Sequence, residues 1–274
     1  MKYQPSLPEH NDNVSHRKPL REFLLIMAAL SALALALFWL SGLAIDWAVE
    51  RMSPEMEARI QRALAVPAEP DKSARPALQV RLQQMTDALR ACAGIFYPVT
   101  VQVEESELPN AFALPGARIV VFTGLLDKVS SQNGLSFVLA HELSHLKNRD
   151  HLRGLGRGLL LIAVSTLLTG ARSDLTQILV PANQVGAARH SQARETAADS
   201  SALDILECRF GHAGGATEFF EQLLEDKDEP IGLGHFLDSH PAVQARIADQ
   251  QRLIRERGYR IAPVVPLAAD FKAR

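Results

Sequence analysis

Two histidines with the spacing of metal ligands, and a glutamate beside the first of them, are the residues of this chain best suited to chemistry. His141, Glu142 and His145 form the pattern H-E-x-x-H. A helix turns once in about 3.6 residues, so both imidazoles would lie on one face and could reach one metal ion. Glu142 could then contact a metal-held water without taking a coordination position. The pattern predicts a metal centre that activates water.

The surrounding residues predict a buried helix that begins near Ser131 or Asn133. Its apolar positions recur at helical spacing. These positions are Leu135, Val138, Leu139, Leu143 and Leu146. The alternative is a core helix with two hydrogen-bonded histidines and a surface glutamate. Charged residues are rarely buried without partners, which favours a polar site that faces a cleft.

A third metal ligand must come from elsewhere, because a catalytic zinc takes three protein ligands and leaves a position for water. Glu195 and Asp199 are again four residues apart. Glu195 would bind the metal, while Asp199 would accept the second ring N–H of a ligand histidine. Taken alone, the two would be exposed acids beside Arg194. Following an H-E-x-x-H helix, they indicate a site for one Zn²⁺ per chain.

A separate stretch near the N-terminus predicts a membrane anchor. The 23 residues from Phe23 to Ile45 carry no charge. A helix of about 20 apolar residues crosses a bilayer core. Basic residues precede the stretch and acidic residues follow it, which favours a cytoplasmic N-terminus. The basic residues are Arg17, Lys18 and Arg21, and the acidic ones are Asp46 and Glu50.

The alternative to an uncleaved anchor is a signal peptide that is cleaved near Gly42 or Ala44. The apolar run is longer than the roughly 7–15 residues of a signal peptide core, so we favour the anchor. The formal charge of −2 and the absence of a basic stripe exclude nucleic acid as the expected partner.

The chain divides into five expected parts. These are a cytoplasmic tail (1–22), the transmembrane anchor (23–45), a helix and linker (46–76), a main domain (77–258) and a C-terminal tail (259–274). Ser53 is expected to cap the helix after the anchor.

Within the main domain, apolar periodicity predicts helices over 77–92, 191–208, 216–225 and 241–256. Alternation at Val99, Val101 and Val103 predicts a strand, and Pro115-Gly116 predicts the turn of a hairpin. The fold class is therefore mainly α (α+β), with a small antiparallel sheet packed on the H-E-x-x-H helix.

Two shorter apolar runs, 158–171 and 175–188, predict a helical hairpin. Both are shorter than a membrane span, so the hairpin would rest on the protein or dip into the bilayer surface rather than cross it. The two cysteines, Cys92 and Cys208, could form a disulfide in an oxidising compartment or could be two buried apolar residues. The sequence leaves both alternatives open.

The motifs together resemble the gluzincin metallopeptidases of the HtpX and CAAX-prenyl-protease-like family. H-E-L-S-H followed by E-x-x-A-D carries the resemblance, which extends over most of residues 77–258. Further matches are Asn110-Ala111-Phe112 in the edge-strand motif, Asn148-Arg149-Asp150-His151 at the helix end, and Ser239-His240-Pro241 with Arg246-Ile247 in the late motif. Gln192 departs from the family, which often has arginine there.

The resemblance implies zinc-assisted peptide hydrolysis with Glu142 as the general base. It also implies that His240 either stabilises the oxyanion or occupies the open zinc position, which the sequence cannot separate. Asn110, Ala111 and Phe112 would bind an extended substrate by adding it to the edge of the sheet.

The function expected is that of a zinc endopeptidase of protein quality control, anchored in a bacterial inner membrane with its catalytic domain in the periplasm. Unfolded or membrane proteins would be the substrates. The bilayer would be contacted through 23–45, with 158–188 as a second candidate. The alternative is a chaperone-like assembly factor whose zinc site is gated or rarely active. The retention of Glu142 argues against it, because a purely structural site does not need a base.

Overall fold

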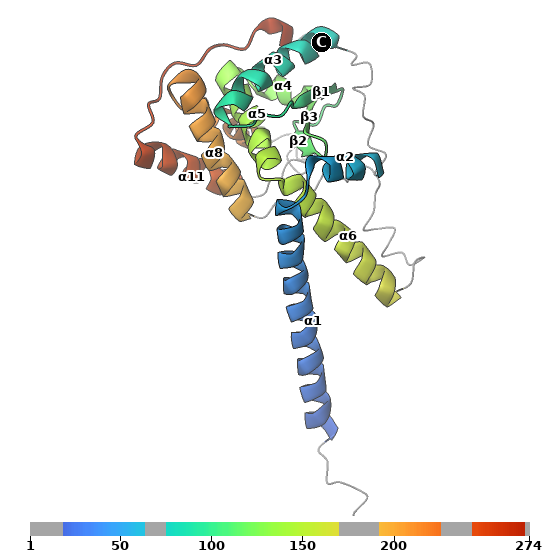
Figure 1. The fold of residues 1–274 in the computed structure, drawn as a ribbon. Helices are drawn as coiled ribbons and strands as arrows, with labels where there is room; N and C mark the ends of the chain where they lie inside the picture. The colour runs from blue at the N-terminus through green and yellow to red at the C-terminus, as the bar shows by residue number, and fades with distance from the viewer. Residues whose placement is uncertain (1–18, 64–74, 170–191, 226–242, 272–274) are drawn as a thin grey trace, which may run out of the picture. The chain divides into compact units, whose positions relative to one another are not determined.

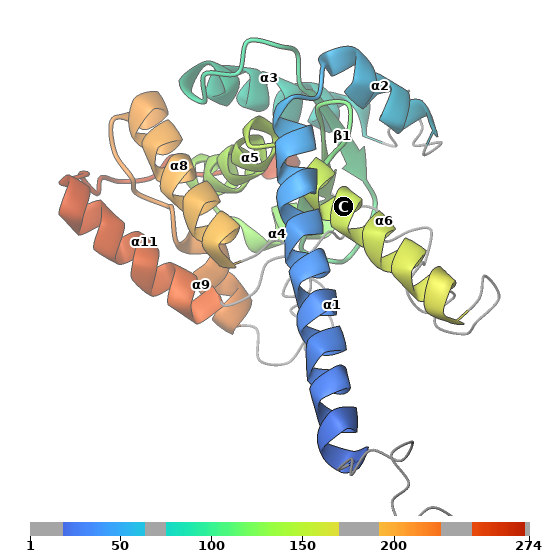
Figure 2. The ribbon, with the colours of Figure 1, turned by 60° about the horizontal axis from the view of Figure 1, so that its bottom comes forward.

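The computed structural model describes residues 19–63, 75–169, 192–225 and 243–271, and it separates the chain into two compact units, Met1–Trp47 and Ala48–Arg274. Figures 1 and 2 show the elements coloured from blue at the N-terminus to red at the C-terminus. The described elements are α1 (Pro19–Glu50), α2 (Pro54–Ala63), α3 (Pro76–Cys92), β1 (Thr100–Glu104), β2 (Ala111–Leu114), β3 (Arg118–Phe122), α4 (Thr123–Lys128), α5 (Gln132–Lys147), α6 (Asp150–Thr169), α8 (Gln192–Phe210), α9 (Glu218–Glu225), α11 (Val243–Arg257) and the 3-10 turn η1 (Ala269–Phe271).

Helix α1 contains the whole predicted anchor and exposes its apolar side chains. Val49 is its one buried residue. Among the described residues, α1 is the one helix long and apolar enough to cross a membrane. The following helix, α2, begins as predicted, since the Ser53 hydroxyl accepts a hydrogen bond from the Met56 N–H at 3.3 Å.

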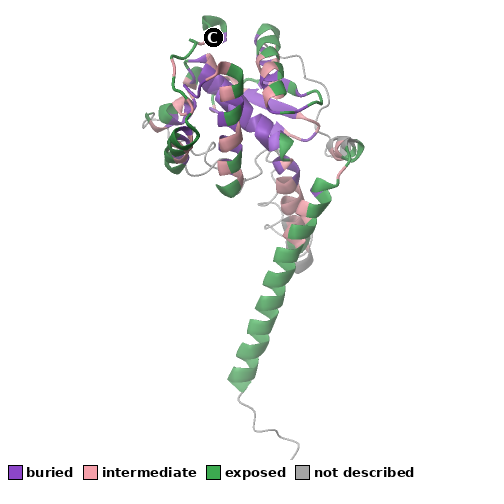
Figure 3. Ribbon diagram, turned by 60° about the vertical axis from the view of Figure 1, so that its left-hand side comes forward, coloured by how far each residue is buried: buried purple, intermediate pink, exposed green. Residues whose placement is uncertain are grey.

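The second unit is built around α5, which is buried from Asn133 to Leu146. Figure 3 shows α5 and the sheet as the buried centre of this unit. Helices α3 and α8 both pack against α5, and α11 packs against α8. The Ser131 hydroxyl caps α5 by accepting the Gly134 N–H at 2.9 Å, which confirms one of the two predicted starts. The mainly helical fold class is confirmed.

The sheet has the order β1-β3-β2. Strands β2 and β3 form the predicted antiparallel hairpin, and Gly116 in its turn has φ +84°. Strand β1, however, runs parallel to β3. The sheet is therefore mixed rather than antiparallel throughout. Apolar alternation indicates a strand but not its direction, which depends on long-range pairing.

Two further segments differ from the sequence-based expectation. Helix α6 begins at Asp150, before the apolar run that predicted it. The remainder of the predicted hairpin, residues 170–188, lies outside the described residues. Residues 259–271, expected as a tail, contact the domain: the Leu267 N–H donates to the Ser130 carbonyl at 2.8 Å, and Phe271 is buried. These contacts lack a periodic sequence pattern, so they could not be predicted.

Cys92 and Cys208 form a disulfide with a Cα–Cα distance of 5.8 Å. It ties the C-terminal end of α3 to the C-terminal end of α8, which settles the alternative that the sequence left open.

Candidate metal centre

Helix α5 positions the two histidines at the centre of the domain. The Nε2 atoms of His141 and His145 lie 3.0 Å apart, and the rings meet edge to face. His141 is 4% exposed, Glu142 is 2% exposed and His145 is fully buried. The one-turn spacing thus places both imidazoles at a single point, as the sequence predicted, and it buries the neighbouring carboxylate beside them.

Helix α8 brings Glu195 to the same point. Its two carboxylate oxygens lie 3.4 Å from Nε2 of His141 and 3.3 Å from Nε2 of His145. One ligand atom each of His141, His145 and Glu195 lies within 4.8 Å of the other two. These three residues could therefore hold a metal ion.

Each histidine also has a carboxylate at its other ring nitrogen. Oδ1 of Asp199 lies 2.9 Å from Nδ1 of His141, as the spacing of Glu195 and Asp199 predicted. Oδ2 of Asp150 lies 3.0 Å from Nδ1 of His145. Such contacts fix the ring orientation and leave Nε2 directed at the metal position. The role of Asp150 was missed in the sequence, although its place just after the H-E-x-x-H helix was a usable signal.

Arg246, on α11, was also missed as a site residue. Its Nε and Nη2 donate to the two carboxylate oxygens of Asp199, at 2.8 and 2.6 Å. Its Nη1 lies 2.8 Å from Oε2 of Glu195, and its guanidinium stacks over the Phe220 ring at 4.5 Å. One buried cation therefore balances two buried carboxylates, an arrangement that burial of charge requires.

The protonation of the site follows from this charge arrangement. Burial would raise the pKa of Asp199, but the charge and hydrogen bonds of Arg246 outweigh it and lower that pKa to about 2. Burial would lower the pKa of His145, but hydrogen bonds to Asp150 and Glu195 outweigh it and raise that pKa to about 10. The pKa of His141 is raised in the same way. A raised pKa makes each imidazole hold its proton more tightly, and metal binding has to displace that proton.

The donor set fits a catalytic metal ion. Two imidazoles and one carboxylate are the ligands of a zinc site that keeps a position open for water, and both imidazoles have the outer carboxylates typical of such sites. Within the described residues, no cysteine or second carboxylate joins this group as a fourth ligand.

The predicted substrate strand is an edge strand. Strand β2 pairs with β3 on one side only, and it packs against α5. Ala111 is buried, Phe112 stacks edge to face on Phe122 at 5.5 Å, and the Asn110 carbonyl accepts the Phe122 N–H at 3.0 Å. Its other side is free of strand pairing within the described residues. His240 lies outside the described residues.

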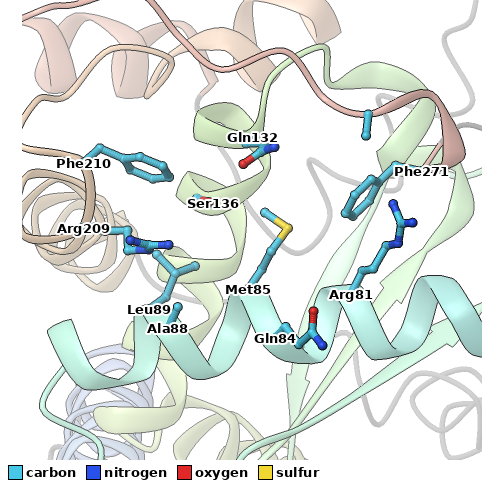
Figure 4. A pocket seen from close by; sticks show the side chains of 11 residues that line it. Arg81, Gln84, Met85, Ala88, Leu89, Gln132, Ser136, Arg209, Phe210 and Phe271 are labelled. Carbon is cyan, nitrogen blue, oxygen red and sulfur yellow. The ribbon is translucent and has the colours of Figure 1, made fainter.

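A groove of about 510 Å³ lies apart from this centre. Figure 4 shows Met85 from α3 and Ser136 from α5 lining it, with Arg209 at one end and Phe271 at the other. None of the residues that carry the metal-donor atoms lines the groove. The groove is therefore not the site of the predicted chemistry.

Comparison with known proteins identifies the family. The model of peptidase family M48 matches residues 76–254, well over half of the chain. The chain belongs to peptidase family M48. This confirms the resemblance inferred from H-E-x-x-H and E-x-x-A-D, and it agrees with a metal-dependent peptidase site at His141, His145 and Glu195.

Several proteases are similar to this chain. Protease HtpX homolog 1 of Streptomyces coelicolor is 29% identical over 229 residues, covering 66% of this chain and 73% of that protein. A protease HtpX homolog of Gemmatimonas aurantiaca is 37% identical over 99 residues, covering 35% of this chain and 32% of that protein. Mitochondrial metalloendopeptidase OMA1 of Saccharomyces cerevisiae is 27% identical over 166 residues, covering 58% of this chain and 47% of that protein. The chain thus spans less than half the length of the latter two.

Proposed function

We propose that this protein is a membrane-anchored zinc endopeptidase that hydrolyses peptide bonds in misfolded or membrane proteins. The observation that carries the proposal is the convergence of His141, His145 and Glu195 within 4.8 Å, with Glu142 buried beside them. Membership of the M48 family and the similarity to HtpX-type and OMA1 proteases support it.

His141, His145 and Glu195 would hold the zinc ion. When bound, the ion supplies Lewis acidity toward the scissile carbonyl and lowers the pKa of a bound water toward about 7. Glu142 takes a proton from the attacking water as the general base, and then delivers it to the leaving amine. Asp199 and Asp150 hold the imidazoles in the orientation that ligation needs.

Substrate binding is assigned to the open edge of β2. An extended chain that pairs with Asn110, Ala111 and Phe112 would be held by its backbone groups, which every sequence shares. Such binding suits a protease that acts on unfolded chains of many sequences. His240, brought in by the Ser239-His240-Pro241 motif, would donate a hydrogen bond to the oxyanion or occupy the open zinc position in the resting enzyme.

The disulfide supports placing the catalytic domain outside the cytoplasm. Disulfides persist in oxidising compartments such as the periplasm, and the basic residues before α1 favour a cytoplasmic N-terminus. We therefore propose a single-pass protein of a bacterial inner membrane with a periplasmic catalytic domain. Thiol alkylation of the protein in intact cells tests this: Cys92 and Cys208 should resist labelling until a reductant is added. Rapid labelling without reductant would place the domain in the cytoplasm.

The test of the activity compares the full-length wild-type chain with Glu142→Gln in detergent. Both should bind one zinc ion, and only the wild type should cleave unfolded casein. The isosteric amide cannot take the proton, so the rate should fall by about 100-fold or more. Equal cleavage by the two proteins would exclude Glu142 as the base. Zinc binding without cleavage in the wild type would favour the assembly-factor alternative.

A further inference from the structure

Residues 149–151 contact both the metal centre and the segment that follows the membrane anchor. We propose that Arg149 is a positioning residue through which the end of α1 sets the affinity of the metal centre. The proposal rests on the proposed zinc site. It concerns contacts within the unit Ala48–Arg274, to which the last turn of α1 belongs.

Arg149 lies in the short connection between α5, which ends at Lys147, and α6, which begins at Asp150. Its N–H donates to the Leu146 carbonyl at 3.0 Å, and its carbonyl accepts from the N–H groups of Leu152 and Arg153 at 3.1 and 3.2 Å. Its φ is +55°, a left-handed conformation that residues other than glycine rarely adopt. A glycine or asparagine would fit this turn at lower cost, so the arginine side chain must contribute something else.

The guanidinium of Arg149 holds the end of α1. Its Nη1 donates to the carbonyls of Val49 and Met52, at 2.9 and 2.6 Å. Carbonyls at the end of a helix lack partners within the helix, so a cation is a favourable ligand for them. The residue that turns the chain after the H-E-x-x-H helix is thereby fixed to the last turn of α1 and to the residues that follow it.

The next residue acts on the metal centre. Asp150 is 2% exposed, and its Oδ2 lies 3.0 Å from Nδ1 of the metal ligand His145. Its other oxygen lies 3.7 Å from Nε of Arg194, which adjoins the ligand Glu195. Asp150 directly follows Arg149, the residue with the left-handed backbone conformation. A change in the backbone at Arg149 would therefore displace the Asp150 carboxylate from His145.

His151 adds a second contact to the same side as Arg149. Its Nε2 lies 3.3 Å from Oε1 of Glu57 on α2, and the same carboxylate oxygen accepts the Gly116 N–H at 3.2 Å. Side chains 149 and 151 therefore hold the segment after the anchor, while side chain 150 holds the metal ligand. A shift of that segment against α5 would be transmitted to His145, which makes metal affinity dependent on the placement of residues 49–57 against α5.

The test measures zinc affinity of the full-length chain in detergent by competition with a chelator. In Arg149→Asn the side chain tolerates positive φ but lacks the guanidinium. We expect zinc to bind roughly 10-fold more weakly, at the lower end of the 10–100-fold loss typical of outer-shell changes, and Asp150→Asn to lose at least as much. In the double variant, Arg149→Asn should add little, because both act through the same contact with His145. Arg252→Asn, an exposed residue of α11, should leave the affinity unchanged.

Two results would overturn the proposal. One is an Arg149→Asn chain that melts earlier without metal but binds zinc as tightly as the wild type, which would mean a purely structural role. The other is a double variant whose loss equals the product of the two single losses. If Arg149→Asn does not fold, Arg149→Lys, which keeps one donor, is read by the same criteria with a smaller loss. Failure of the proposed function is distinct, because there the wild type itself would hold no zinc or would not cleave.

Discussion

Helices α1 and α5 are both rich in leucine, yet they are built for opposite surroundings. In α1 the leucines are exposed, for example Leu33 at 56% and Leu40 at 52%. In α5, Leu135, Leu139 and Leu143 are fully buried, on a helix that also encloses His141, Glu142 and His145. Apolar composition marks both helices. What separates them is the polar cluster that α5 carries. Four charged residues from outside α5 contact this cluster or one another: Asp150, Glu195, Asp199 and Arg246.

The largest effect should follow removal of Glu195, the metal ligand that α8 places beside the two histidines of α5. Glu195→Ala deletes one of three metal ligands, so we expect bound zinc to be lost and casein cleavage to fall below detection. Elemental analysis and a cleavage assay on the same samples measure both. Asp204→Ala, on the same helix but away from the donors, is the matched control and should keep both. Full zinc occupancy in Glu195→Ala would assign the third ligand elsewhere.

The next effect concerns the buried cation. Arg246→Met leaves Asp199 and Glu195 without their shared counter-charge, and breaking such a buried pair costs about 3–5 kcal/mol. Denaturant unfolding of the metal-free chain should show this loss. Arg252→Met changes an exposed arginine of the same helix and should alter the free energy of unfolding by less than about 0.5 kcal/mol. Equal, small changes for both would contradict a balancing role for Arg246.

The same substitution in the two helices should separate their roles. Leu139→Ala opens a cavity at a fully buried position of α5, and we expect the free energy of domain unfolding to fall by about 2–5 kcal/mol. Leu33→Ala, in α1, should leave domain unfolding in detergent unchanged. A comparable loss from Leu33→Ala would show that α1 belongs to the folded core of the domain.

The smallest expected effect is that of the disulfide. Replacing both Cys92 and Cys208 by alanine should lower the free energy of unfolding by about 2–4 kcal/mol, because the cross-link restricts the unfolded chain. Zinc affinity should not change, since Glu195 and Cys208 lie at opposite ends of α8. A large loss of zinc affinity would show that the disulfide holds the metal ligands in place.

Spacing alone located much of the candidate site. His141 and His145, and then Glu195 and Asp199, are pairs four residues apart, and helical geometry converts that spacing into one shared face. Arg246 could not be found in this way. It lies 105 positions from His141, and only the packing of α11 on α8 brings it to the carboxylates. Asp150 is near in sequence, but its contact depends on the left-handed turn at Arg149.

The elements of the fold likewise fall into those that local sequence patterns predict and those that they do not. The hairpin at Gly116 and the helices follow from local patterns. The parallel pairing of β1 with β3 and the docking of residues 259–271 arise from long-range contacts. Those contacts have no periodic signature, so no local rule would predict them.

The measurement that tests the central claim most directly is X-ray absorption at the zinc edge on the full-length chain, loaded with one equivalent of zinc. The structure predicts two imidazole nitrogens and carboxylate or water oxygens at about 2.0–2.2 Å, and no sulfur. Glu195→Ala should lose the bound zinc and with it this spectrum, whereas Glu142→Gln should keep the spectrum unaltered. Sulfur ligation, or a spectrum that Glu195→Ala leaves unaltered, would contradict a metal centre made of His141, His145 and Glu195.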